Sequence, residues 1–308
     1  MKKIIAAVGA VMTAVTLSAQ EAGAESEEVE TEEEESAVFE AGVDVDFFSA
    51  YVWRNSVQND RMVIQPCVWA DYTQLDPFWF GFSVWQNYDL TSRRYDALSH
   101  GLTETDFNVH VGATAWANDD ESMKLELEFG HEWYDNHFVK NEAKGDLADT
   151  RELYFKATFS NPVVGVYGQA SWMYDDFGCF EQGMHYELGL NREFGLVEDK
   201  LTLGVDWNLN FGDSHYLYYL YAGLSNPYTY EEGGEVFEED DYDRGPSGGI
   251  GATTLKVYLS WAITDWLSLK GTVAYTGLLN GELRQAHGDY DDENRDLVWG
   301  GLSLNVAF

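Results

Sequence analysis

Apolar residues alternate with polar, small or charged residues in one short segment after another from Phe39 onwards. In residues 125–129, Leu, Leu and Phe occupy the odd positions, while Glu126 and Glu128 occupy the even ones. Residues 201–210 and 298–308 repeat this scheme. A period of two places the two sets of side chains on opposite faces of a sheet. The chain is therefore expected to be all-β, with one apolar face and one face that carries charge.

The connections between these segments predict the architecture. About twelve strands are expected, at residues 38–52, 60–72, 77–88, 103–116, 123–136, 149–159, 163–175, 181–193, 199–211, 250–262, 265–278 and 295–308. Short and long connections alternate, apart from two short ones at 53–59 and 176–180. An even number of strands, with short turns at one end and long loops at the other, is typical of bacterial outer-membrane barrels. We therefore predict a transmembrane antiparallel β-barrel, with the Tyr-rich stretch 214–224 as a β extension of its largest outer loop.

The N-terminal residues predict export. Lys2 and Lys3 precede an apolar run, residues 4–17, that is too short to cross a bilayer as a helix. The run ends in small residues, as a secretory signal does, with cleavage after Ala19 or Ala24. Residues 1–24 are thus expected to be a cleaved signal peptide, 25–37 an acidic disordered linker, and 38–308 the barrel.

The charge of the chain excludes several partners. There are 54 acidic and 18 basic residues, and the formal net charge is −36. Such a surface repels nucleic acid, whose phosphates must be neutralised by basic side chains, and it disfavours a basic face against anionic lipid. Eleven Trp and 19 Tyr suit the two interfaces of a membrane. Cys67 and Cys179 could pair in an oxidising periplasm, but two cysteines alone leave that open.

The last strand ends on an aromatic residue. Val306, Leu304 and Leu302 precede Phe308 at alternate positions. This pattern resembles the C-terminal signal that the barrel-assembly machinery recognises on outer-membrane proteins, so that machinery is an expected partner through Phe308.

A second resemblance, to the TorF-like family of outer-membrane porins, covers most of the chain after residue 38. Residues 47–55, 60–72, 78–89 and 103–113 carry it. The matching positions are Tyr51, Val52, Arg54, Gln65, Pro66, Glu104 and Asp106, whereas Asn55 stands where Gly is usual. The resemblance implies a porin-like channel, and the acidic tract and the long acidic loop depart from the family pattern.

The polar face of the strands predicts the lining of a lumen. The residues expected to line it are Asp44, Asp46, Asp106, His110, Glu126, Glu128, Glu152, Lys156, Glu187, Asp206 and Lys270. Rings of carboxylates favour cations and repel anions. We therefore expect passive diffusion of ions or small hydrophilic solutes, with cation preference at low salt. The alternative is that these carboxylates hydrate a plugged interior.

No metal site, cofactor or catalytic group is expected. The acidic loop 230–245 lacks the spacing of a calcium-binding helix-loop-helix motif, so it is interpreted as a solvated surface, with weak divalent binding or lipopolysaccharide bridging as alternatives. His131 is placed on the lipid face without a Ser on that face, and His110 and His185 point into the lumen. An enzyme needs a nucleophile beside a base, and the sequence indicates none.

Two other functions stay open. A non-conducting barrel could serve as a structural anchor or adhesin. Outer-membrane lipid and lipopolysaccharide are expected partners of the barrel whether or not it conducts. A soluble carbohydrate-binding β-sandwich would use Trp79, Trp85 and Trp133 as platforms for sugars, but it explains neither the terminal Phe308 nor the alternation of the connections.

Overall fold

The computed structural model describes residues 39–91, 101–136, 150–174, 182–214, 216–217, 228–232, 235–239, 248–284 and 296–308. The expected signal peptide, the acidic linker and Cys179 lie outside these residues. Those expectations, and the pairing of Cys67 with Cys179, stay predictions.

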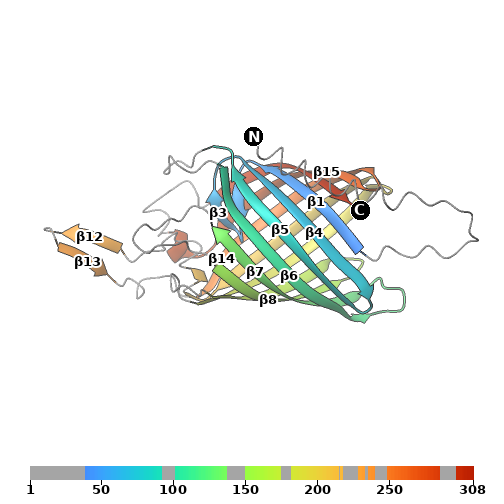
Figure 1. Ribbon diagram of the computed structural model, residues 1–308, viewed down its shortest axis with the longest axis horizontal. Helices are drawn as coiled ribbons and strands as arrows, with labels where there is room; N and C mark the ends of the chain where they lie inside the picture. The colour runs from blue at the N-terminus through green and yellow to red at the C-terminus, as the bar shows by residue number, and fades with distance from the viewer. Residues whose placement is uncertain are drawn as a thin grey trace, which may run out of the picture. The chain divides into compact units, whose positions relative to one another are not determined.

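Twelve antiparallel strands close into a barrel whose strands run obliquely to its axis (Figure 1). Its strands are β1 (Phe39–Phe48), β4 (Val63–Leu75), β5 (Phe78–Asp89), β6 (Gly101–Ala117), β7 (Lys124–Asn136), β8 (Thr150–Ser160), β9 (Gly165–Tyr174), β10 (Gly183–Val197), β11 (Leu201–Gly212), β14 (Gly249–Thr264), β15 (Leu267–Leu278) and β16 (Asp296–Ala307). Each strand pairs with the barrel strands before and after it, and β1 pairs with β16 to close the ring. The predicted all-β, twelve-stranded antiparallel barrel is confirmed.

The outside of the barrel is apolar. Val298 is 70% exposed and Val273 is 62% exposed, and large apolar side chains on every barrel strand share this orientation. An apolar surface of this extent is stable only against hydrocarbon. Exposed tryptophans lie towards both ends of the strands, such as Trp133 on β7 and Trp261 on β14, as expected at the two membrane interfaces. The barrel therefore has the architecture of a bacterial outer-membrane protein.

The two ends of the barrel differ in the length of their connections. At one end, which we call the short-turn end, the strands are joined by residues 76–77, 118–123, 161–164, 198–200 and 265–266. The longer connections lie at the opposite, long-loop end. The turn 118–123 is held by its own side chains, because Asn118 Oδ1 accepts a hydrogen bond of 2.8 Å from the Met123 amide. Hydrogen bonds from Ser122 also lower the pKa of the Asp120 carboxyl.

Two expectations about the connection after β1, at the long-loop end, are wrong. The first predicted strand, 38–52, ends at Phe48, and the predicted short outer loop at 53–59 is part of a hairpin, formed by β2 (Tyr51–Trp53) and β3 (Ser56–Asn59).

The Tyr-rich stretch 214–224 begins as a helical turn and not as β structure. Asp213 starts that turn, because its carboxylate accepts a hydrogen bond of 2.8 Å from the amide of Tyr216. Residues 218–224 lie outside the described ones. None of the helical segments in the described ranges is long and apolar enough to cross a bilayer. A second hairpin, β12 (Tyr228–Glu232) with β13 (Glu235–Glu239), lies within the connection from β11 to β14.

Inward-facing glycines leave room for aromatic rings on the neighbouring strand. An added Cβ at Gly189 would lie 2.0 Å from the ring of Tyr167, its partner in the β9–β10 register. The same relation holds for four further register pairs, Gly42 with Trp69, Gly112 with Trp79, Gly130 with Tyr154, and Gly204 with Tyr258. The rings thus lie across the bare backbone of the adjacent strand, so they fill the inner wall without projecting far into the lumen.

Substitution of Gly189 by Ala is expected to lower the free energy of unfolding by about 1–3 kcal/mol, the usual cost of overfilling a packed site. The Tyr167 ring would have to move, which breaks its 2.7 Å hydrogen bond to Glu187. Gly195→Ala on the same strand is the matched control, because an added Cβ there meets no atom within 4 Å. Urea unfolding of both variants in detergent micelles measures the difference, and equal stabilities would contradict the ring-on-glycine packing.

Candidate functional site in the barrel lumen

The hairpin of β2 and β3 is folded into the lumen from the long-loop end. Its tip has two residues, Arg54 and Asn55, with φ angles of 48° and 64°. Positive φ at both central positions defines the tight turn that best matches the twist of a β-hairpin, and Asn adopts it more readily than most residues. Tyr51, Ser56 and Asn59 are all buried, although they belong to a connection and not to a barrel strand. The lumen is what buries them.

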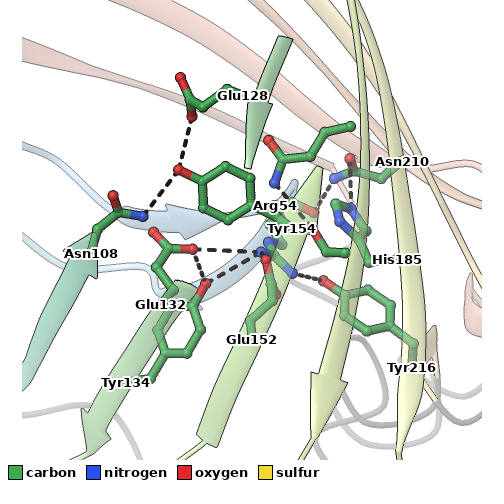
Figure 2. Close-up of polar contacts among 12 residues, drawn as sticks. Arg54, Asn108, Glu128, Glu132, Tyr134, Glu152, Tyr154, His185, Asn210 and Tyr216 are labelled. Atoms are coloured by element: carbon green, nitrogen blue, oxygen red, sulfur yellow. Dashed lines mark hydrogen bonds and ion pairs between the residues drawn. The ribbon is translucent and has the colours of Figure 1, made fainter. Parts of the chain in front are cut away.

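Arg54 lies at the centre of a polar network inside the barrel (Figure 2). Its guanidinium forms an ion pair with Glu152 of β8 and lies 4.0 Å from Glu132 of β7. It also donates hydrogen bonds to the hydroxyls of Tyr216, at 3.0 Å, and Tyr134, at 3.3 Å. One side chain on the hairpin therefore bridges two strands of the wall and the helical turn that follows β11.

Other contacts fix the backbone of the hairpin. The Asn210 side chain donates a hydrogen bond to the carbonyl of Arg54, and its oxygen lies 3.1 Å from His185 Nε2. Asn55 donates a hydrogen bond of 3.3 Å to the carbonyl of Ala252 on β14. The Tyr51 hydroxyl donates one of 2.9 Å to Glu104 on β6. The hairpin is thus bound to opposite walls of the barrel.

Charge explains why this network has Arg54 at its centre. Glu152 is fully buried, with one carboxylate oxygen on Arg54 and the other without a hydrogen-bond partner in the described part of the chain. Glu132 on the neighbouring strand β7 lies close to Glu152, and Asp106 on β6 lies close to Glu132 and Arg54. Burial, the largest single effect, lowers the pKa of the Arg54 guanidinium, but the Glu152 carboxylate and the hydroxyls of Tyr134 and Tyr216 together outweigh it and raise the pKa above its usual value. The arginine therefore keeps its charge and balances that of the acidic wall.

A cavity of about 360 Å³ lies beside the hairpin. Ala50 and Val52 of the hairpin segment form part of its wall, and inward residues of β1, β4, β11, β14, β15 and β16 form the rest. Asp206, Lys256 and Lys270 belong to this lining and lie further along their strands towards the short-turn end than the contacts of Arg54. We refer to this cavity as the chamber.

The residues predicted to line the lumen fall into three groups. Glu152 and Asp106 lie at the Arg54 network, and Asp46, Asp206 and Lys270 lie at the chamber. The others contact neighbours along the wall: Asp44 with Asn305, His110 with Asp71 and Asn108, Glu126 with Lys124, Glu128 with Tyr154, Glu187 with Tyr167 and Asn208, and Lys156 with the Tyr167 ring. Their role as the lining of a conducting pore stays a prediction.

Sequence reasoning missed the residues that hold the hairpin. Arg54, Glu132, Tyr134, Tyr216 and Asn210 were not among the predicted site residues, although Arg54 belongs to the motif that resembles the TorF-like family. The pair Arg54-Asn55 between alternating segments was a usable signal, because Asn at such a point favours a two-residue turn. Its distant partners left no trace in the local sequence.

The remaining candidate chemistry is sparse. His131 lies on the outward parity of β7, where its Nε2 is 2.8 Å from the Tyr174 hydroxyl. His185 is buried beside the hairpin with its ring 4.8 Å from that of Tyr216. Within the described residues, no group of three His, Cys, Asp or Glu side chains is arranged to hold a metal ion. Cys67 lies on β4 and forms no disulfide with any of the described residues.

Comparison with models of protein families gives no match, and comparison with curated protein sequences gives none either. Among solved structures, an outer-membrane channel from Pseudomonas putida F1 is similar over 91% of this chain and all of its own, with 13% sequence identity and a TM-score of 0.49. The NanC porin is similar over 86% of this chain and 98% of its own, with 9% identity and a TM-score of 0.46. The KdgM porin is similar over 87% of this chain and 99% of its own, with 10% identity and a TM-score of 0.42.

Proposed function

We propose that this barrel is an outer-membrane channel for passive diffusion of ions and small hydrophilic solutes, narrowed near its long-loop end by the β2–β3 hairpin. One observation carries the proposal: the inner wall is charged and polar, and beside the hairpin it encloses a chamber lined by charged side chains. A barrel that served only as an anchor would have no need of such a space. The resemblance to the TorF-like porins supports the same function and stays a prediction itself.

We propose further that the channel prefers cations. Inward carboxylates outnumber inward lysines and arginines, and many of them hold hydrogen bonds from neutral donors, such as Glu128 with Tyr154 and Glu187 with Tyr167. A neutral donor leaves the negative charge in place, so it acts on any ion in the lumen.

In a planar bilayer with a gradient of KCl, the reversal potential is expected to have the sign of a cation-selective pore. The preference should weaken as salt rises, because the screening length falls from about 10 Å at 0.1 M to about 3 Å at 1 M. Glu128→Gln with Glu187→Gln should reduce the preference, whereas Glu198→Gln in the exposed turn 198–200 should change it far less. Anion selectivity would contradict the proposed preference, and the lack of any conductance would favour the anchor or adhesin.

A further inference from the structure

The chamber contains charged side chains of both signs that form no direct ion pair with one another within the described residues. Asp206 is directly opposite Lys256 in the β11–β14 register. Asp46 and Lys270 are each opposite Ser303, one on either side of β16. Within the described residues, no ion pair within 4.0 Å joins any of these four side chains, whereas Lys124 and Glu126 are 2.7 Å apart elsewhere on the wall.

Charges held apart in a confined space favour a ligand that can reach both. A protein interior lowers the effective dielectric constant, so an ammonium group of the wall attracts a free carboxylate there more strongly than it would in bulk water. The same holds for a wall carboxylate and a free ammonium group. A solute with one charge would satisfy one kind of side chain only, and would face repulsion from the other kind.

One part of the chamber wall suits an apolar group. Phe48 and Trp299 pack edge to face with their centroids 5.4 Å apart, and Ala50 and Val52 lie in the same lining. Lys270 lies 5.8 Å from the centre of the Tyr258 ring. The volume of about 360 Å³ falls at the lower end of the range for small-molecule sites, which is about 300–1,000 Å³.

We propose that the chamber binds small zwitterionic solutes with an apolar side group, the chemical class of the aliphatic α-amino acids. The carboxylate binds one lysine and the ammonium group binds the acidic residue nearest to that lysine, Lys256 with Asp206 or Lys270 with Asp46, while the aromatic wall contacts the side group. The inference deepens the proposed function, because it gives the diffusing solute a preferred site in the lumen. It involves no chemical step.

Calorimetry on the full chain in non-ionic detergent tests the binding directly. The probes are L-valine, isovalerate, which lacks the amino group, and isobutylamine, which lacks the carboxylate. Valine is expected to bind at least about tenfold more tightly than either, since a charged hydrogen bond is worth roughly one order of magnitude in affinity. Equal or tighter binding of isovalerate would overturn the zwitterion site in favour of an anion site, and no binding of valine would overturn it outright.

Variants identify the side chains. The double variant Lys256→Met with Lys270→Met should weaken valine binding by at least about tenfold. Asp206→Asn should also weaken valine binding, and this variant should still bind isovalerate less tightly than the parent binds valine. Lys200→Met, in the exposed turn at the short-turn end, is the matched control and should bind valine as the parent does. A shift in gel mobility on heating shows that each variant is folded. Unchanged affinity in the folded double variant would contradict the assignment.

The same samples in planar bilayers separate this inference from the proposed channel. A conducting barrel that does not bind valine would overturn the zwitterion site and leave the channel intact. A barrel that binds valine without conducting would overturn the channel and leave the site intact. If the barrel both conducts ions and binds valine, valine should lower the current through the parent channel. At the same valine concentration, the decrease in current should be at least about tenfold smaller for the lysine double variant.

Discussion

Arg54→Met is expected to lower the free energy of unfolding by about 3–5 kcal/mol, the usual cost of removing one partner from a buried ion pair. The Arg54 side chain is 8% exposed and that of Glu152 is fully buried, so the carboxylate would be left without its counter-charge. The substitution also removes the hydrogen bonds to Tyr134 and Tyr216. Urea unfolding in detergent, followed by tryptophan fluorescence and by the shift in gel mobility, measures the loss.

The same connection supplies a matched control. Arg61 lies near the end of the loop, where its side chain is 47% exposed and pairs with Asp60 at 3.3 Å. Exposed ion pairs are worth less than about 1 kcal/mol, so Arg61→Met should leave stability almost unchanged. A comparable loss of unfolding free energy in the two variants would show that the buried position of Arg54 in the lumen does not contribute to stability.

A double variant tests the reason for the loss. Glu152→Gln removes the charge that Arg54 balances, and the neutral amide can stay buried at a lower cost. Arg54→Met with Glu152→Gln should therefore be more stable than Arg54→Met alone. If the second substitution adds to the first loss, then contacts other than the ion pair hold the hairpin in place.

The barrel was predictable because its signals are local. Phe107, Val109 and Val111 share one face in the sequence, and all three are exposed on the outside of β6. Apolar and polar residues still alternate on either side of a β-bulge, such as the one between Thr114 and Trp116, because a bulge shifts the register only of the residues beyond it. The lengths of the connections are likewise visible in the chain. Together they determined the strands and their order.

The hairpin was not predictable from the same signals. Residues 51–53 are Tyr, Val and Trp, which favour β structure in any setting, so they extend the pattern of β1 without a break. What separates a barrel strand from a hairpin in the lumen is its set of partners. Arg54 finds Glu152 and Tyr216 at sequence separations of 98 and 162 residues, and no local pattern records such contacts.

The chamber was predictable only in part, for a related reason. Asp46, Asp206 and Lys270 were expected on the inner wall from their parity, but parity gives neither height along the barrel nor distance across it. Lys256 has the same parity and was passed over. The volume of the chamber depends on where the hairpin lies, and therefore on contacts that the sequence does not display.

Replacing residues 50–61 by a short Gly-Ser linker is expected to raise the single-channel conductance several-fold. The linker still joins Ser49 to Met62, and the connection lies outside the barrel strands, so the wall can close as before. Removing the hairpin takes Tyr51, Trp53 and Arg54 out of the lumen together. Glu152 and Tyr134 would then face water, so the loss of stability should be smaller than in Arg54→Met, where the carboxylate stays buried.

Conductance distinguishes a hairpin that obstructs the lumen from one that only braces the wall. The control replaces the turn 118–123, at the short-turn end, by a Gly-Ser linker of the same length, which should leave the conductance near that of the parent. If the hairpin variant is folded and its conductance equals that of the parent, ions bypass the Arg54 network. The narrowest point of the pathway would then lie elsewhere. An increase of conductance confined to the hairpin variant would instead place that point at the β2–β3 hairpin.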